Sequence, residues 1–320
     1  MDYGVGKGFF PMPETFPLRF APWHQGQLGI PGTTPVDGVR VFYVHGIDGI
    51  GSDTLHDGLS PVQAYLTLTK ALSMCTNTSR DYIVVIDYWQ PTGETWPIWI
   101  DKDNVHIIGA DGGGTHMPLI IPPADTAGMV IAADRVEVGA LALGGGATHG
   151  CFENDPTGGA AHWGLLIRDC WFGVLGGGQD GFRNVGDGDL PYLTITHCVF
   201  GTGLTRDGVR IQFNATRCQI GTPWANGGNL FFQIPGIGVN ATGGGNSANL
   251  GIFNNLFSVP ANTAGGAISI AANVTASFIS GNVANFGDTT MGNNPYADAS
   301  PAGTNNWGLN YQGIVAVMPS

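Results

Sequence analysis

The chain has 320 residues and a net charge of −12, yet only 11% of its residues are charged, against roughly 25% in a typical soluble protein. Its lysines are Lys7, Lys70 and Lys102 alone, so no basic stripe is available for nucleic acid, and no apolar run approaches the ~20 residues of a membrane span. The low charge fits a surface covered by copies of the chain or by a partner. It fits equally well an exterior built from Thr, Asn, Ser and Gly.

Residues 1–38 contain no periodic element and are rich in proline and aromatic residues. A disordered tail would be poor in aromatics, and proline is excluded from helix interiors and central strands. We therefore predict an extended arm that lies on its own domain or, in the interpretation we favour, on a neighbouring subunit. No signal peptide is expected, because this segment has no apolar core run. The expected partner-binding anchors of the arm are Phe9, Phe10, Phe16, Phe20 and Trp23.

Residues 39–79 are predicted to form an N-terminal module. A strand over 39–45 is followed by a glycine- and acid-rich segment, which lacks the Glu of an EF-hand at the twelfth position. Ser60 and Pro61 are typical of an N-cap and a first helical position, and the helix should run to about residue 75. Its apolar face would consist of Leu68, Ala71, Leu72 and Cys75.

Residues 80–287 repeat one local pattern at unequal intervals. Apolar runs around Val105, Val136 and Leu166 come first, spaced by about 30 residues. A five-fold motif follows, whose central residue is Cys or Asn between apolar positions, and whose copies are centred on Cys170, Cys198, Cys218, Asn255 and Asn282. A constant motif with loops of variable length between its copies indicates a coil of stacked strands.

A second strand motif follows each Cys or Asn by about ten residues. Its copies begin with glycine turns at Asp180, Asp207, Gly227 and Gly265. We therefore predict an all-β fold, a single-stranded right-handed parallel β-helix of seven or eight coils. The five Cys and Asn residues would stack ~4.8 Å apart at one corner as a structural ladder. Residues 288–320 are expected to form a C-terminal extension that ends in a short strand.

Part of the N-terminal module resembles a known family. Between Tyr43 and Leu72 the chain contains Tyr-Val-His-Gly, Gly-Ser-Asp, Asp-Gly-Leu-Ser-Pro and Lys-Ala-Leu, followed by a β-run. This pattern is similar to the start of pectin-lyase-like β-helix proteins, which include polysaccharide lyases and bacteriophage tailspike and virion surface proteins. The resemblance implies that the helix caps the open end of the coil. It does not by itself imply an activity.

Candidate catalytic residues follow from the same resemblance, since the enzymes of this family carry carboxylates on an outer sheet face. In lyases an Arg or Lys base and calcium accompany them. The best match is two in-step motifs that would place Asp180 over Asp207 and Arg183 over Arg210. Such carboxylates could share a proton or a cation. The alternative is a structural turn in which each Arg neutralises a stacked Asp.

Other candidate sites are weaker. His149, Cys151 and His162 match no metal-ligand spacing, so no metal site is expected. No nucleophile elbow, zinc-protease motif or phosphate loop is present. The tryptophans at 163, 171 and 224 could form a sugar-stacking groove, or they could pack in the core or between subunits.

These observations favour a non-enzymatic virion protein, a phage-type capsid cement, decoration or spike protein. It would be a homotrimer without a cofactor, assembled in the host cytoplasm and held on the virion surface by its arm to capsid or other virion proteins. The alternative is a carbohydrate-active tailspike-type polysaccharide lyase or hydrolase, which could use calcium. A glycan-binding module without turnover is a third hypothesis.

Overall fold

The computed structural model describes most of the chain from residue 39 onward, and the predicted arm with its anchors lies outside the described residues. The described ranges are 39–77, 79–110, 117–154, 161–174, 177–185, 189–201, 203–212, 214–224, 228–242, 247–259, 266–286, 295–312 and 315–317.

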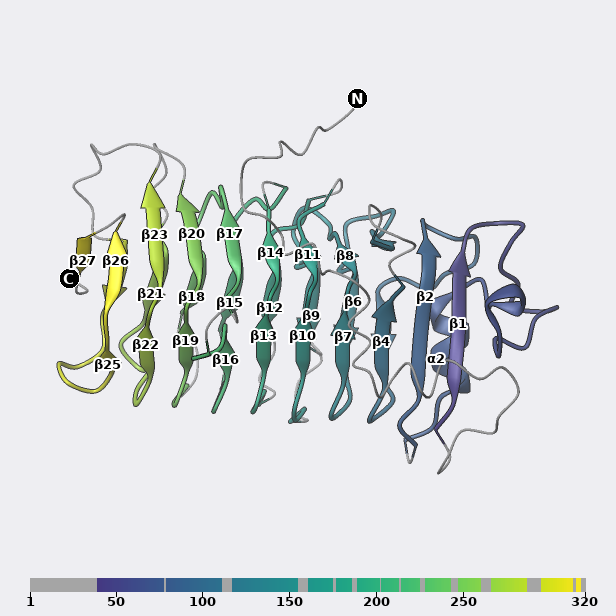
Figure 1. Ribbon diagram of the computed structural model, residues 1–320, viewed down its shortest axis with the longest axis horizontal. Helices are drawn as coiled ribbons and strands as arrows, with labels where there is room; N and C mark the ends of the chain where they lie inside the picture. The colour runs from purple at the N-terminus through teal and green to yellow at the C-terminus, as the bar shows by residue number, and fades with distance from the viewer. Residues whose placement is uncertain are drawn as a thin grey trace.

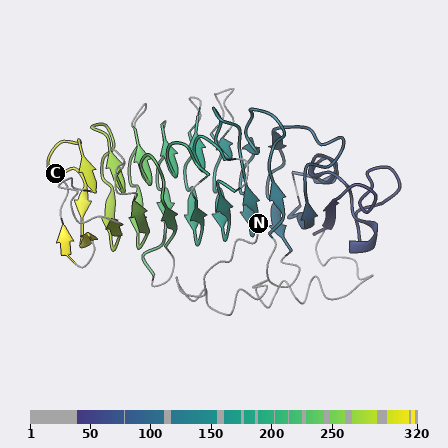
Figure 2. The ribbon, with the colours of Figure 1, turned by 90° about the horizontal axis from the view of Figure 1, so that it is seen from above.

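The chain winds into a parallel β-helix of about seven turns, as predicted (Figures 1 and 2). Each turn adds one strand to each of three sheets, which we call sheets 1, 2 and 3 in the order in which a complete turn, such as β4, β5 and β6, passes through them. Backbone hydrogen bonds run along the coil axis, so every turn is held by the turns before and after it.

Sheet 1 has ten strands: β1 (Val41–Gly46), β2 (Tyr82–Tyr88), β4 (His106–Gly109), β7 (Glu137–Gly139), β10 (Leu166–Arg168), β13 (Thr194–Thr196), β16 (Gln219–Ile220), β19 (Gly251–Phe253), β22 (Phe278–Ser280) and β25 (Asn306–Trp307). Sheet 2 has nine: β5 (Leu119–Ile120), β8 (Ala142–Leu143), β11 (Trp171–Phe172), β14 (Val199–Phe200), β17 (Leu230–Phe232), β20 (Leu256–Val259), β23 (Val283–Phe286), β26 (Asn310–Gln312) and β27 (Val315–Val317). Sheet 3 has eight: β3 (Ile98–Ile100), β6 (Met129–Ile131), β9 (Phe152–Asn154), β12 (Phe182–Asn184), β15 (Val209–Ile211), β18 (Val239–Ala241), β21 (Ile268–Ile270) and β24 (Tyr296–Asp298).

The coil continues into the stretch expected to be a C-terminal extension. Strands β24, β25 and β26 add one strand to each sheet, parallel to the strands before them. Strand β27 then pairs antiparallel with β26 within the same chain.

The N-terminal module differs from the prediction in where its helix begins. Pro61–Gln63 form only a 3-10 turn (η2), and the side chain of Ser60 makes no capping hydrogen bond. The next residues stay extended because Tyr65 pairs with β1: its N–H donates to the Tyr43 carbonyl and its carbonyl accepts from His45. Helix α2 (Leu68–Met74) therefore starts only after Thr67, whose side chain accepts from the Lys70 N–H.

Helix α2 closes the first turn of the coil. It contacts β1 and β3, the first strands of sheets 1 and 3, and lies at the purple and blue end in Figure 1. Leu68, Ala71 and Leu72 are buried against the coil interior, as predicted. The N-terminal N–H groups of α2 donate to the Glu94 carboxylate, at 2.8 Å from Leu68 and 3.2 Å from Thr69. The helix thus covers apolar residues that the first rung would otherwise expose.

The core consists of rows of identical or similar side chains stacked along the axis. Sheet 1 contributes a buried aliphatic row: Ile83, Ile107, Val138, Ile167, Ile195, Ile220, Ile252 and Ile279. Sheet 2 contributes four stacked rings: Phe172, Phe200, Phe231 and Phe257, with centroids 4.6–4.7 Å apart.

The predicted Cys and Asn ladder exists, but Cys218 does not belong to it. Cys198 is followed by Asn229, whose Oδ1 accepts from the Cys198 N–H at 2.9 Å. The ladder contains Cys170, Cys198, Asn229, Asn255 and Asn282, each directly before a strand of sheet 2, and Asn310, the first residue of β26. Cys218 instead precedes β16 in sheet 1, in a row with Leu193 and Leu250. Leu230–Phe232 follows Asn229 and therefore lies in sheet 2. The sequence analysis had instead placed it as the second strand of its repeat.

Two bends of each coil have the same local sequence pattern, which explains this error. At each bend a residue with positive φ precedes a side chain that turns into the core. His197 and Asn254 take this conformation before sheet 2, and Arg217 and Asn249 take it before sheet 1, all with φ between 53° and 57°. A Cys after such a residue therefore fits either corner.

We expect Asn255→Ala to lower the free energy of unfolding by about 2–3 kcal/mol, because buried polar groups would lose their partners. Asn255 Oδ1 accepts from both the backbone and the side chain of Asn229 at 2.9 Å, and its Nδ2 donates to Asn282 at 3.0 Å. Urea unfolding would measure the change. Cys198→Ala removes a weakly hydrogen-bonded thiol from the same ladder and should lower the free energy of unfolding by less. Equal losses for the two variants would contradict a role for the amide ladder.

Candidate functional site

The four candidate catalytic residues do come together at sheet 3, with the two arginines on its strands and the two aspartates buried in the bends before β12 and β15. Arg183 and Arg210 are direct partners on β12 and β15, as predicted. Asp180 accepts from the Asp207 backbone N–H at 3.1 Å, which places the two carboxylates on neighbouring turns. Two residues that the sequence prediction omitted complete what we call the Asp/Arg ladder, which consists of Glu153, Asp180, Arg183, Arg206, Asp207 and Arg210.

Asp180 and Asp207 of the Asp/Arg ladder each accept hydrogen bonds from several neighbouring groups. Arg206 Nε donates to Asp180 at 2.9 Å, and a second guanidinium nitrogen donates to the other oxygen of Asp180. Asp207 accepts from Arg210 at 2.8 Å, from the Ile237 N–H at 2.8 Å and from the Asn240 amide at 3.0 Å.

The burial of Asp180 and Asp207 determines whether the Asp/Arg ladder can bind a ligand. Asp180 is 0% and Asp207 2% exposed, so neither carboxylate faces a ligand in this arrangement. Burial alone would lower the pKa of Arg206, but its hydrogen bond to Asp180 and the charge of that carboxylate raise the pKa above its ordinary value. The contacts join β9, β12, β15 and β18 across four turns. This geometry supports the structural interpretation that the sequence left open.

A second charged group lies on sheet 1 and is partly exposed to solvent. We call it the His106 cluster: His106, Glu137, Arg168 and Asp169. His106 and Glu137 are register partners on β4 and β7, with Nδ1 2.6 Å from the carboxylate. Arg168 Nε donates to Glu137 at 2.5 Å, and Arg168 Nη1 donates to Asp169 at 2.7 Å. The His106 ring stacks on Tyr82, with centroids 4.4 Å apart.

The neighbours of Glu137 in the His106 cluster keep this carboxylate ionised. Burial would raise the pKa of Glu137, but hydrogen bonds from His106 and Arg168, together with the Arg168 charge, bring it down to about 2. An ionised carboxylate can only accept, so His106 Nδ1 must donate to it. His106 Nε2 is then the ring nitrogen not committed to Glu137, as required of a group that binds a ligand or transfers a proton.

We expect the His106 cluster to stabilise the fold at neutral pH and to lose this effect in acid. The folded-state pKa of Glu137 is about 2, below its ordinary 4.5, so the contribution is complete above about pH 5 and is lost as pH falls through 2. The shift corresponds to about 3 kcal/mol. Acid titration of the unfolding free energy would show this loss in the wild type. Glu137→Gln should flatten the curve between pH 5 and 2, and an unchanged slope would contradict the assignment.

The sequence spaced Val105 and Val136 in the observed register, which pairs His106 with Glu137, but it slipped by one residue at Leu166 and so turned Arg168 to the opposite face from Glu137. The sequence aligned Val136 with Leu166, whereas the structure pairs Glu137 with Leu166. A shift by one residue exchanges inward and outward positions of a strand. With the observed register, the residues after Val105 and Val136 point outward together. Those residues are His106 and Glu137.

The exposed tryptophans do not form a single sugar-stacking groove. Trp163 lies at the bend before sheet 1, Trp171 on sheet 2 and Trp224 in the loop after β16. Trp163 is instead close to Tyr192, with ring centroids 6.0 Å apart, and both are exposed. The Arg217 guanidinium lies 5.5 Å from the Tyr192 ring centroid. This aromatic pair occurs in the turns that carry β10 and β13.

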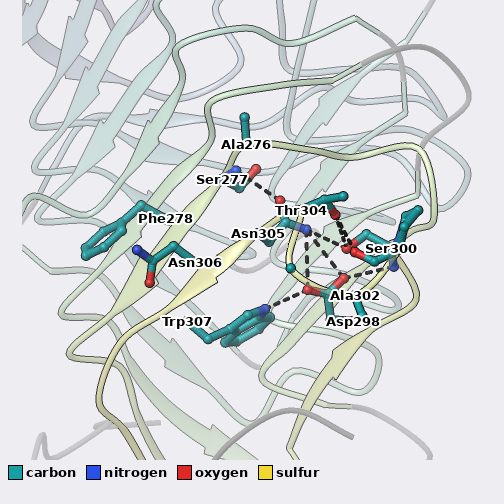
Figure 3. Close-up of a pocket in the computed structure, with 12 residues that line it drawn as sticks. Ala276, Ser277, Phe278, Asp298, Ser300, Ala302, Thr304, Asn305, Asn306 and Trp307 are labelled. Carbon is teal, nitrogen blue, oxygen red and sulfur yellow. Dashed lines mark hydrogen bonds between the residues drawn. The ribbon is translucent and has the colours of Figure 1, made fainter.

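A shallow groove of about 780 Å³ lies at the C-terminal end of the coil (Figure 3). Phe278 and Asn306 lie on one side of it and Asp298 and Ser300 on the other. Asp298 accepts from the Trp307 indole at 2.7 Å and from the Ser300 N–H at 2.9 Å. Burial would raise the pKa of Asp298, but these hydrogen bonds lower it, so the groove contains a fixed negative charge.

Among the described residues, no three His, Cys, Asp or Glu side chains lie close enough together to hold a metal ion. All five cysteines are free and buried. Burial raises the pKa of the Cys151 and Cys218 thiols to about 12, so neither is a reactive thiolate at neutral pH. No helix in the described part of the chain is long and apolar enough to cross a membrane.

Comparison of the chain with models of known protein families, with curated proteins and with solved structures found no match. The similarity to pectin-lyase-like proteins therefore rests on the residues between Tyr43 and Leu72 and on the coil itself.

Proposed function

We propose that this chain is a non-enzymatic structural protein of a virus particle, a phage-type capsid decoration or spike protein. It self-associates, as a homotrimer, and attaches to capsid or other virion proteins through the anchors of its N-terminal arm. In this proposal it assembles in the host cytoplasm and stands on the virion surface. The aromatic and proline-rich composition of residues 1–38 and the low overall charge support the proposal.

The observation that carries the proposal is the Asp/Arg ladder. Its carboxylates are the best match to catalytic residues of the enzymes that the N-terminal module resembles, yet Asp180 and Asp207 are buried and paired with Arg206 of the next turn and with Arg210 of the same turn. Charged groups in this arrangement fix the register of the coil. A stiff coil held together in this way suits a protein whose task is mechanical, standing out from a particle.

Removal of residues 1–38 tests the proposal. The truncated protein should keep the β-sheet circular dichroism and the thermal midpoint of the full chain, because the described coil begins at residue 39. It should no longer sediment with particles that lack the protein. A full-length variant with serine in place of Phe9, Phe10 and Phe16 separates loss of the anchors from loss of chain length. Attachment of the truncated chain at wild-type strength would refute the role of the arm.

A second candidate is the carbohydrate-active function, and the His106 cluster favours it. This cluster is partly exposed, contains a histidine oriented by a carboxylate, and occurs with the exposed Trp163–Tyr192 pair on overlapping turns. A screen of acidic polysaccharides with and without calcium would reveal reducing or unsaturated ends if cleavage occurs. Glu137→Gln should then abolish the release of these ends. Asp207→Ala tests whether the buried Asp/Arg ladder is the catalytic site instead. Binding without release would indicate a glycan-binding module.

A further inference from the structure

The outer face of sheet 2 differs from the other two faces of the coil because it contains no charged residue. None of its strands from β5 to β27 includes Asp, Glu, Lys, Arg or His. Sheet 1 carries Glu137 and Arg168 on its outer face, and sheet 3 carries Glu153 and Arg183. A sheet face that met only water would be expected to alternate apolar inward with polar outward residues.

One outward position on each strand of sheet 2 from β8 to β26 forms a continuous apolar row along the coil, beside a second outward position that holds Phe232 on β17 and Ser258 on β20. We call this apolar row the sheet 2 row: Ala142, Trp171, Val199, Leu230, Leu256, Val283 and Tyr311. The residue after each of the middle members, such as Phe231 after Leu230, points into the core and is buried. At ~4.8 Å per turn the row is about 29 Å long.

The exposed members of this face are large and aromatic. Trp171 is 42% exposed, and Phe232, which follows the row on β17, is 40% exposed. Aromatic side chains that are flat, apolar and rigid are the typical anchors of protein interfaces. A contiguous apolar surface of this length in a soluble protein indicates a surface that is covered by something.

Two features select a second copy of this chain as the partner. A second copy has the same spacing between turns, so each residue of its row can contact a residue of this row over the full length. An unrelated surface would not have this spacing. In symmetric association a residue also meets copies of itself or of its neighbours, so charged residues would face like charges. Sheet 2 is the face without charges.

We infer that copies of this chain associate through the outer faces of sheet 2, with the rows side by side along the coil axes. The inference rests on the self-association included in the proposed function, but not on attachment to particles. It assigns the contact to one face and leaves the His106 cluster and the Asp/Arg ladder outside it.

Light scattering of the purified protein after size exclusion tests this assignment. The wild type should have a mass of at least two chains of 33.4 kDa each. Leu230→Glu would bury a charge at the middle of the row and should weaken association by about 100-fold or more, while circular dichroism stays unchanged. Gln219→Glu, on the outer face of sheet 1 in the same turn, is the matched control and should remain oligomeric. A monomeric wild type, or an oligomeric Leu230→Glu, would overturn the inference.

A cysteine variant keeps the test decisive if Leu230→Glu fails to fold. All five native cysteines are buried, so Leu230→Cys would introduce the accessible thiol. Oxidation should then yield a disulfide-linked dimer on a non-reducing gel, and Gln219→Cys should yield none. Rapid maleimide labelling of Leu230→Cys without cross-linking would mean that the face is free or covered by another partner, and would overturn the inference. Both assays use the isolated protein, so loss of particle attachment on truncation does not affect them.

Discussion

Replacement of Asp180 with alanine is expected to lower the free energy of unfolding by about 3–5 kcal/mol, the usual cost of removing one partner from a buried ion pair. Asp180 is 0% exposed and accepts two bonds from the Arg206 guanidinium and one from the Asp207 backbone N–H. The variant would leave a partly buried guanidinium without its acceptor. Urea unfolding followed by circular dichroism measures the loss.

Two further variants separate this cause from general damage. Asp101→Ala removes an exposed carboxylate paired only with its neighbour Lys102, and it should change stability by about 1 kcal/mol or less. Asp180→Ala combined with Arg206→Ala removes the stranded charge, so the double variant should be less destabilised than the sum of the single ones. A loss for Asp180→Ala no larger than that for Asp101→Ala would refute a stabilising role of the Asp/Arg ladder.

The fold could be predicted from the sequence because its physical cause repeats. Each turn buries its apolar residues only against the adjacent turns, so the same small set of residues recurs at each bend. This recurrence placed Cys170 above Cys198 and Asn255 above Asn282, and the structure confirms both pairs. It also brought Arg183 next to Arg210.

The assignment of residues to faces could not be predicted as well. The two bends of a coil share a positive-φ residue followed by a small or apolar one, so Cys218 was placed at the wrong corner and Asn229 was missed. A slip of one residue at Leu166 turned Arg168 away from Glu137, although the spacing of Val105 and Val136 already placed His106 beside Glu137. Periodicity determines that strands stack, whereas loop length determines which strands do. The connection between β16 and β17 is longer than the corresponding connections from sheet 1 to sheet 2 in the three preceding turns.

The buried core offers the second large effect, at the middle of the phenylalanine stack. Phe231 is 1% exposed, and its ring centroid lies 4.6 Å from that of Phe200 and 4.7 Å from that of Phe257. Phe231→Ala should lower the free energy of unfolding by about 3–5 kcal/mol, because it creates a cavity and interrupts the stack. The coil cannot collapse onto this cavity, since the backbone hydrogen bonds of β14, β17 and β20 fix the spacing of adjacent turns.

Two control variants, compared by urea unfolding, show whether the volume, the stacking or the burial of the Phe231 ring stabilises the coil. Phe231→Leu retains most of the apolar volume and should cost about 1.5 kcal/mol or less, the remainder being the contribution of ring stacking. Phe278→Ala removes a ring of the same size from the outer face of sheet 1, where it is 44% exposed, and should cost much less than Phe231→Ala. Similar losses at Phe231 and Phe278 would mean that the stacked rings do not hold adjacent turns together. In that case the backbone ladders and the buried polar rows would have to supply the cohesion of the coil.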